Sequence, residues 1–194
     1  MIRRLPVIPT ILVGLAAAVM IGLGVWQIGR AGEKEALLAQ YRAAQKQPPI
    51  AFPTTALAGE LPLFRWATGY CLRPTGRRAV AGHNRRGESG FVQVVLCSTG
   101  AEGPGMAVEL GWSKDPNAQW QWNGGPVTGV IAPDREYRMR LVAASAPNGL
   151  EPSALPSIES IPNNHRLYAV QWFLFAAIAL LIYVLALRKR LNAE

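Results

Sequence analysis

The chain has 194 residues, half of them apolar and 16% charged, with a formal net charge of +8. This length suffices for one compact domain and two membrane spans, and the low charge content indicates a membrane protein. A positive charge can indicate nucleic-acid binding, but five of the twenty basic residues flank apolar runs at the chain ends, where they act first as topology signals. The composition therefore argues against a nucleic-acid-binding protein.

The N-terminal segment predicts a membrane-spanning helix. Residues 1–9 form a short end with Arg3 and Arg4, and residues 10–28 form an apolar run. A cleaved signal peptide is the main alternative, because it shares the basic start and the apolar core. The run is longer than a usual signal-peptide core and continues into a charged helical segment, which favours an uncleaved anchor.

One face of this span consists of small residues. Gly14, Ala18 and Gly22 recur at every fourth position, which allows another helix to approach closely. We expect the second membrane helix to pack there. Residues 29–47 are rich in helix formers and predict a helical extension that stops before Pro48.

Residues 48–162 predict a small, mostly antiparallel β domain and its connector, so that the fold is an α+β membrane protein. Short apolar runs and turn signals place five strands, at residues 64–72, 91–96, 106–112, 127–131 and 136–142. The basic segment 76–88 is expected to be a surface loop, with His83 exposed. Residues 150–162 contain three prolines and predict an extended connector.

Two cysteines, Cys71 and Cys97, lie in this domain. Their spacing matches no redox or metal motif. They form either one disulfide in an oxidising compartment or two buried small side chains, and their sequence context does not choose between these alternatives.

Residues 163–187 predict a second membrane helix, followed by a basic end at residues 188–194. No charged residue occurs from Leu167 to Leu187, a span that matches the thickness of a hydrocarbon core. Because basic residues lie beyond the outer ends of both spans, both termini are expected in the cytoplasm and the domain in the periplasm.

The polar start of the second helix predicts a site. His165, Tyr168 and Trp172 share one helix face, and a neutral imidazole backed by aromatic rings can ligate a haem iron. Arg30 and Arg166 can pair with the propionates. The alternative is an aromatic belt with snorkelling arginines and a histidine that caps the helix.

Two amides at the same expected depth are less typical of such a belt, because polar groups in a membrane usually have partners. They are Gln27, beside Trp26 on the first helix, and Gln171, beside Trp172 on the second. No nucleophile elbow, zinc-binding helix or Gly-rich phosphate loop occurs, so an enzyme is not indicated.

Several segments together resemble the surfeit-locus (Surf/Shy) family of cytochrome c oxidase assembly factors. They are LGVWQIGRAGEKEALLAQYRAA and PPIAFP near the first helix, NNHRLYAVQWFLFA at the second, and GFVQVVL, MAVELGW and GPVTGVI between them. One departure is Leu110 in the stretch from Glu109 to Trp112, where the family commonly has an arginine.

The resemblance implies a non-enzymatic chaperone of the respiratory chain in the bacterial inner membrane. It implies haem a as a transient cofactor, with His165 at the position of the family's haem-associated histidine. The expected partners are the oxidase core subunit, haem a synthase and membrane lipid. Trp26, Tyr168 and Trp172 are expected to flank the macrocycle. The alternative is a cofactor-free accessory subunit that docks through the small-residue face.

Overall fold

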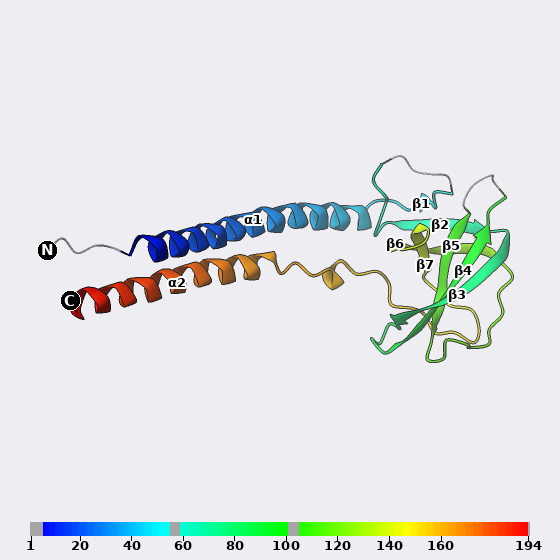
Figure 1. The fold of residues 1–194 in the computed structure, drawn as a ribbon. Helices are drawn as coiled ribbons and strands as arrows, with labels where there is room; N and C mark the ends of the chain where they lie inside the picture. The colour runs from blue at the N-terminus through cyan, green and yellow to red at the C-terminus, as the bar shows by residue number, and fades with distance from the viewer. Residues whose placement is uncertain (1–5, 55–58, 101–104, 194) are drawn as a thin grey trace. The chain divides into compact units, whose positions relative to one another are not determined.

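The computed structural model describes residues 6–54, 59–100 and 105–193, which form two compact units. The helical unit consists of Met1–Leu37 and Pro162–Glu194, and the sheet domain is Leu38–Ile161. The predicted N-terminal arginines, Arg3 and Arg4, lie outside the described residues. Along the chain, one long apolar helix precedes the sheet domain and another follows it, as the sequence predicts (Figure 1).

The two helices are α1, Val7–Gln45, and α2, His165–Ala193. Both are long and apolar enough to cross a membrane. Helix α1 ends shortly before the Pro48-Pro49 pair, which cannot continue a helix. Helix α2 begins where the backbone carbonyl of Asn164 accepts a hydrogen bond from the Tyr168 N–H at 3.1 Å.

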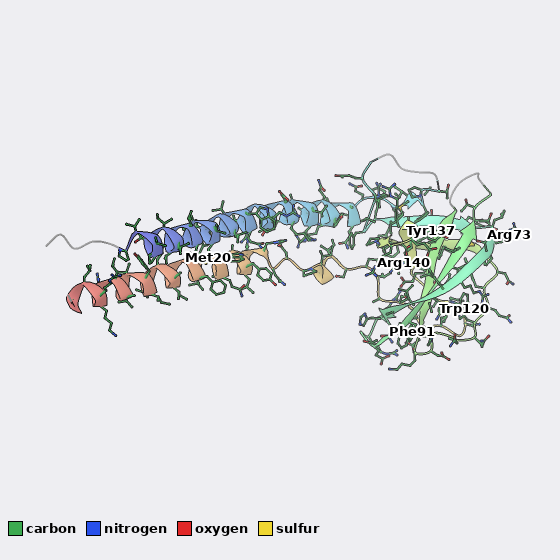
Figure 2. The ribbon with its side chains drawn as sticks, in the orientation of Figure 1. Met20, Arg73, Phe91, Trp120, Tyr137 and Arg140 are labelled. Carbon is green, nitrogen blue, oxygen red and sulfur yellow. A yellow bond between two sulfur atoms is a disulfide. The ribbon has the colours of Figure 1, made fainter. Side chains whose placement is uncertain are left out.

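Small residues every seventh position line the side of α1 that is buried in the helical unit. They are Ala17, Gly24 and Ala31, and the buried alanines of α2 are Ala169 and Ala176, also seven apart. Seven residues turn a helix through almost two whole turns, so these positions stay in line along the axis. This buried row of each helix forms the seam of an antiparallel pair. Half-buried Met20, labelled in Figure 2, lies between Ala17 and Gly24 on the same side of α1.

The predicted packing face of α1 was wrong. A Cβ atom added to Gly14 or Gly22 would meet nothing within 4 Å, and Ala18 is exposed. At Gly24, in contrast, an added Cβ would lie 2.6 Å from the Phe173 ring of α2. The reason is geometric. Each interval of four residues turns about 40° beyond one full helical turn, so residues at this spacing drift around the helix. They therefore do not stay on a packing seam, on which contacts repeat about every 3.5 residues on average.

The sheet domain contains one seven-stranded sheet in the order β1-β2-β6-β7-β5-β4-β3. Neighbouring strands are antiparallel except for the parallel pairs β1–β2 and β5–β7. The strands are β1 Ile50–Ala51, β2 Trp66–Cys71, β3 Arg73–His83, β4 Ser89–Ser98, β5 Met106–Ser113, β6 Gly125–Asp134 and β7 Arg138–Ala143, and a short 3-10 helix, η1, covers Ile158–Ser160.

All five predicted strands are present, but strand β3 was missed because residues 76–88 were expected to form a loop. Strand β3 instead runs to His83, which is exposed as predicted. It is an edge strand, and its arginines and glycines hide the alternation that marks a buried strand. Val80 pairs with Val92, and a Cβ on Gly82 would lie 2.6 Å from that valine.

A disulfide joins Cys71 at the end of β2 to Cys97 in β4, which resolves the two alternatives for the cysteines. Both residues are buried. Their Cα atoms are 5.2 Å apart although three strands separate β2 from β4 in the sheet order. The sheet therefore curves back on itself, and a single residue, Leu72, connects β2 to β3.

The two faces of the sheet differ in the residues that cover them. The larger apolar cluster, which includes Val95, Val108 and Leu141, also contains Leu110, so the residue at the departure from the family pattern is part of the core. The other face combines a smaller cluster around Trp112 with a chain of charges. In this chain Glu109 accepts from Arg140 at 2.7 Å, and Arg140 and Arg78 both contact Asp134, at 3.3 and 2.6 Å (Arg140 and Tyr137 are labelled in Figure 2).

The connector after Leu150 is held against the sheet at two places. Glu151 forms an isolated bridge with Trp112, and Ser153 forms one with Asn84. Further on, Ile158 packs with Leu38 and Phe64 in a third small cluster. The ring of Tyr41, one turn after Leu38, lies 4.7 Å from the Phe64 ring. These contacts lie within the sheet domain, which includes the last turns of α1 from Leu38 onwards.

Asp134 makes the stability of the sheet domain sensitive to acid. Burial alone would raise the pKa of Asp134, but the Arg78 guanidinium and the backbone N–H groups of Tyr137 and Glu136 lower it from 3.8 to about 2. Because the folded pKa is depressed, this contribution is complete above about pH 4 and is lost as the pH falls towards 2. We expect a loss of at most about 2.5 kcal/mol over that range.

Urea unfolding of the full chain in detergent at several pH values measures this loss. Asp134→Asn should be less stable at neutral pH and should have a flatter acid limb. Asp115→Asn, which replaces an exposed carboxylate, is the control. Equal acid limbs for wild type and Asp134→Asn would contradict the assignment.

Candidate functional site

A partly buried side-chain hydrogen bond joins the start of α2 to α1. The Nδ1 atom of His165 lies 2.7 Å from the Oε1 atom of Gln27, and both side chains are half-buried. His165 is the first residue of α2. Gln27 lies on the seam because it follows Gly24 by three residues and precedes Ala31 by four. The structure thus joins the predicted histidine to one of the two predicted amides.

The two predicted arginines already have carboxylate partners. Arg166 forms two bonds with Glu35, from Nε to Oε1 and from Nη2 to Oε2, both at 3.0 Å. Arg30 pairs with Glu33 on its own helix. All four side chains are substantially exposed. Exposed ion pairs contribute about 0–1 kcal/mol, so another carboxylate can replace either glutamate at little cost.

The predicted aromatic residues do not form a single stack. Trp26 is 55% exposed and Tyr168 is 49% exposed, so both lie on the outside of the helix pair. Trp172 is half-buried and packs edge-on against Phe175, with ring centroids 6.1 Å apart. Gln171, the second predicted amide, is exposed. His165, Tyr168 and Trp172 keep their common helix face, as their spacing predicts.

A groove of about 380 Å³ lies between the two helices. Its lining includes the small residues Ala31, Gly32 and Ala169, which leave space between the helices. Glu35 and Arg166 place an ion pair on its rim. The remaining lining is apolar: Ile28, Val170 and Phe173. The groove offers apolar walls and one charged end, which suits an amphiphilic ligand.

Within residues 6–54, 59–100 and 105–193, no group of three or more His, Cys, Asp or Glu side chains is placed to hold a metal ion. A haem iron does not need such a group, because the macrocycle supplies four ligands and the protein supplies the axial one.

Two residues of this arrangement lie outside the predicted site. The sequence indicates Gln27 as an amide at the expected depth without assigning it to the site, and it gives no indication of Glu35. The signal for Gln27 was available, because a buried membrane amide needs a partner. Glu35 gave no such signal, since its contact with Arg166 depends on the register of the two helices.

Comparison with protein families gives a match. The model of the SURF1 family matches residues 14–177, which is most of the chain. The matched region contains the buried row of α1, the whole sheet domain and the first turns of α2 with His165 and Arg166. A search of curated proteins found no match.

Proposed function

Because the chain belongs to the SURF1 family of cytochrome c oxidase assembly factors, we propose that it binds haem a and delivers it to the oxidase core subunit. Its role in oxidase assembly follows from the family, and haem a is the step beyond it. His165 is the proposed axial ligand. The protein would hold and release the cofactor without chemical turnover.

The observation that carries this proposal is the state of the His165 ring. Its Nδ1 atom is engaged by Gln27, which leaves Nε2 for a metal. Metal-binding histidines usually use their second ring nitrogen in such a hydrogen bond. When bound, the haem would supply the iron and the carboxylate-bearing macrocycle.

The other predicted residues fit the cofactor to different degrees. Arg30 and Arg166 would hold propionates by exchanging their present glutamate partners for the cofactor's carboxylates. Trp26, Tyr168 and Trp172 would flank the macrocycle, although Trp26 and Tyr168 now face outwards. The groove beside Arg166 and Ala169 would take an apolar part of the ligand.

We place the protein in the bacterial inner membrane with both termini in the cytoplasm. Two observations support this orientation. Basic residues follow the apolar part of α2, at Arg188, Lys189 and Arg190, as expected of a cytoplasmic end. The Cys71–Cys97 disulfide is typical of an oxidising compartment such as the periplasm.

An absorption spectrum tests the proposed function. Protein purified in detergent from cells that make haem a should show a Soret band, and His165→Ala should lose it. His83→Ala is the matched control, because His83 is the chain's other histidine and is exposed in the sheet domain. It should retain the band of the wild type.

Two outcomes would contradict the proposal. An unchanged band in His165→Ala would remove the ligand assignment. A colourless, well-folded wild type that co-purifies stoichiometrically with the mature oxidase would instead support a cofactor-free accessory subunit.

A further inference from the structure

We infer that Gln27 is a positioning residue: it holds the proton of the neutral His165 ring on Nδ1 and so presents the lone pair of Nε2 for coordination. This inference rests on the proposed haem function for its purpose. Its geometric basis is the 2.7 Å contact between Gln27 Oε1 and His165 Nδ1.

The direction of the hydrogen bond follows from the chemistry of the two groups. An amide oxygen can only accept a hydrogen bond, so the Nδ1 atom that faces it must donate. A neutral imidazole has one proton, and Nε2 is then left as the unprotonated nitrogen. Iron binds only such a nitrogen. The Gln27 oxygen therefore selects the ring form that is ready to bind.

The helix seam keeps the Gln27 amide in place. One turn before it, Gly24 lets the Phe173 ring approach so closely that an added Cβ would lie at 2.6 Å. One turn after it, Ala31 is buried. Gln27 thus lies between two buried positions of α1, and its oxygen reaches the first residue of α2.

A purely structural role is the competing explanation, in which the hydrogen bond only holds the helices together. The helical unit contains a matched contact for separating the two roles. The hydroxyls of Thr10 and Tyr183 form another hydrogen bond between α1 and α2, far from His165 along the helices. Thr10→Val removes that bond and leaves the histidine untouched.

The first measurement uses protein without haem, so it does not depend on haem binding. His83→Ala leaves His165 as the chain's single histidine, and its ¹⁵N resonances report which ring nitrogen carries the proton. The spectra are recorded in alkaline buffer, and a neutral imidazole shows one protonated and one unprotonated ring nitrogen in them, so the tautomer is read directly. In this background, we expect protonated Nδ1 and unprotonated Nε2.

The variants should then separate by the acceptor that they present. Gln27→Leu removes the acceptor, and the resonances should shift towards a mixture of tautomers. Gln27→Glu retains an oxygen at the same reach and should restore protonated Nδ1. Thr10→Val, and Gln171→Leu at the exposed amide of α2, should leave the tautomer unchanged.

Haem a titration is the second measurement. Loss of a hydrogen bond that orients a metal-binding histidine typically weakens metal binding by about tenfold to hundredfold, so we expect Gln27→Leu to weaken haem a binding by that factor. Gln27→Glu should bind haem a with an affinity close to that of the wild type. Thr10→Val and Gln171→Leu should not change the affinity.

The possible failures are distinguishable. A Gln27→Leu variant with the wild-type tautomer would overturn the inference, and so would equal loss of affinity in Gln27→Leu and Thr10→Val, because helix pairing would then be the cause. A protein whose tautomer responds as expected but that takes up no haem a would support the positioning of the ring and overturn only the proposed function.

Discussion

Replacing both Cys71 and Cys97 with alanine should destabilise the sheet domain by about 3.5 kcal/mol. The estimate comes from the chain entropy that a cross-link over 26 residues removes from the unfolded state. The bond also connects strands that lie far apart in the sheet order, so its loss frees the curved sheet to open. Both side chains are buried, so the substitutions also remove buried sulfur atoms from the core. The melting temperature should fall by about 10 °C or more.

Thermal unfolding of the full chain in detergent measures this effect, with tryptophan fluorescence as the signal because Trp112 and Trp120 are buried in the domain. Cys71→Ala alone is the control for the cross-link: it should lose nearly as much stability as the double variant. A double variant as stable as the wild type would contradict a structural role for the bond.

The same cysteines also test the compartment. If the domain is periplasmic, both thiols should be protected from alkylation in intact cells and become reactive only after unfolding with a reductant. Cells that cannot oxidise envelope proteins should accumulate the protein with free thiols and low stability. The disulfide thus links the fold to the proposed location.

The parts of the fold that depend on local sequence were predictable. Apolar length and flanking charge are properties of a contiguous segment, so both membrane helices could be identified. The five predicted strands alternate or are continuously apolar over a few residues, which is again a local pattern. Strand β3 lacks that pattern because its outer face meets solvent, and only its pairing with β4 makes it a strand.

The helix seam shows what local pattern cannot decide. Both Gly14–Gly22 and Ala17–Ala31 present small residues on one face of α1. The choice between them depends on the crossing geometry of the pair, and that depends on α2, where buried alanines recur every seventh residue. A stripe on one helix is therefore insufficient without the matching period on its partner.

The candidate site also has a part that local sequence predicts and a part that it does not. The chemistry of His165 and of the Gln27 amide could be predicted from residue type and expected depth in the membrane. The partnership of His165 with Gln27, 138 positions away, required the register of two helices. The pairing of Arg166 with Glu35 also follows from this register, whereas Arg30 and Glu33 are i,i+3 neighbours on one helix. Under the proposed function, both arginines would bind carboxylates by exchanging a partner and not as free anion sites.

Arg140→Met should destabilise the sheet domain by about 3–5 kcal/mol, the second large effect that we expect. Glu109 is 3% exposed, and Arg140 donates to it at 2.7 Å. Removal of the guanidinium leaves a carboxylate buried between β4 and β7 without its charged partner. An uncompensated buried charge costs much more than the net contribution of the intact pair.

Substitution of the other partner, Glu109→Leu, should cost less stability, because the two side chains differ in burial. The Arg140 side chain is 24% exposed and also donates to the Pro133 carbonyl at 2.9 Å and to Asp134 at 3.3 Å, so it keeps polar partners when Glu109 is replaced. The double variant, Glu109→Leu with Arg140→Met, should then be more stable than Arg140→Met alone, since it contains no buried unpaired charge.

Urea unfolding of the wild type, both single variants and the double variant gives the coupling energy between Glu109 and Arg140 directly. Additive losses would show that Glu109 and Arg140 act independently, and equal losses in the two single variants would contradict the asymmetry that their burial imposes.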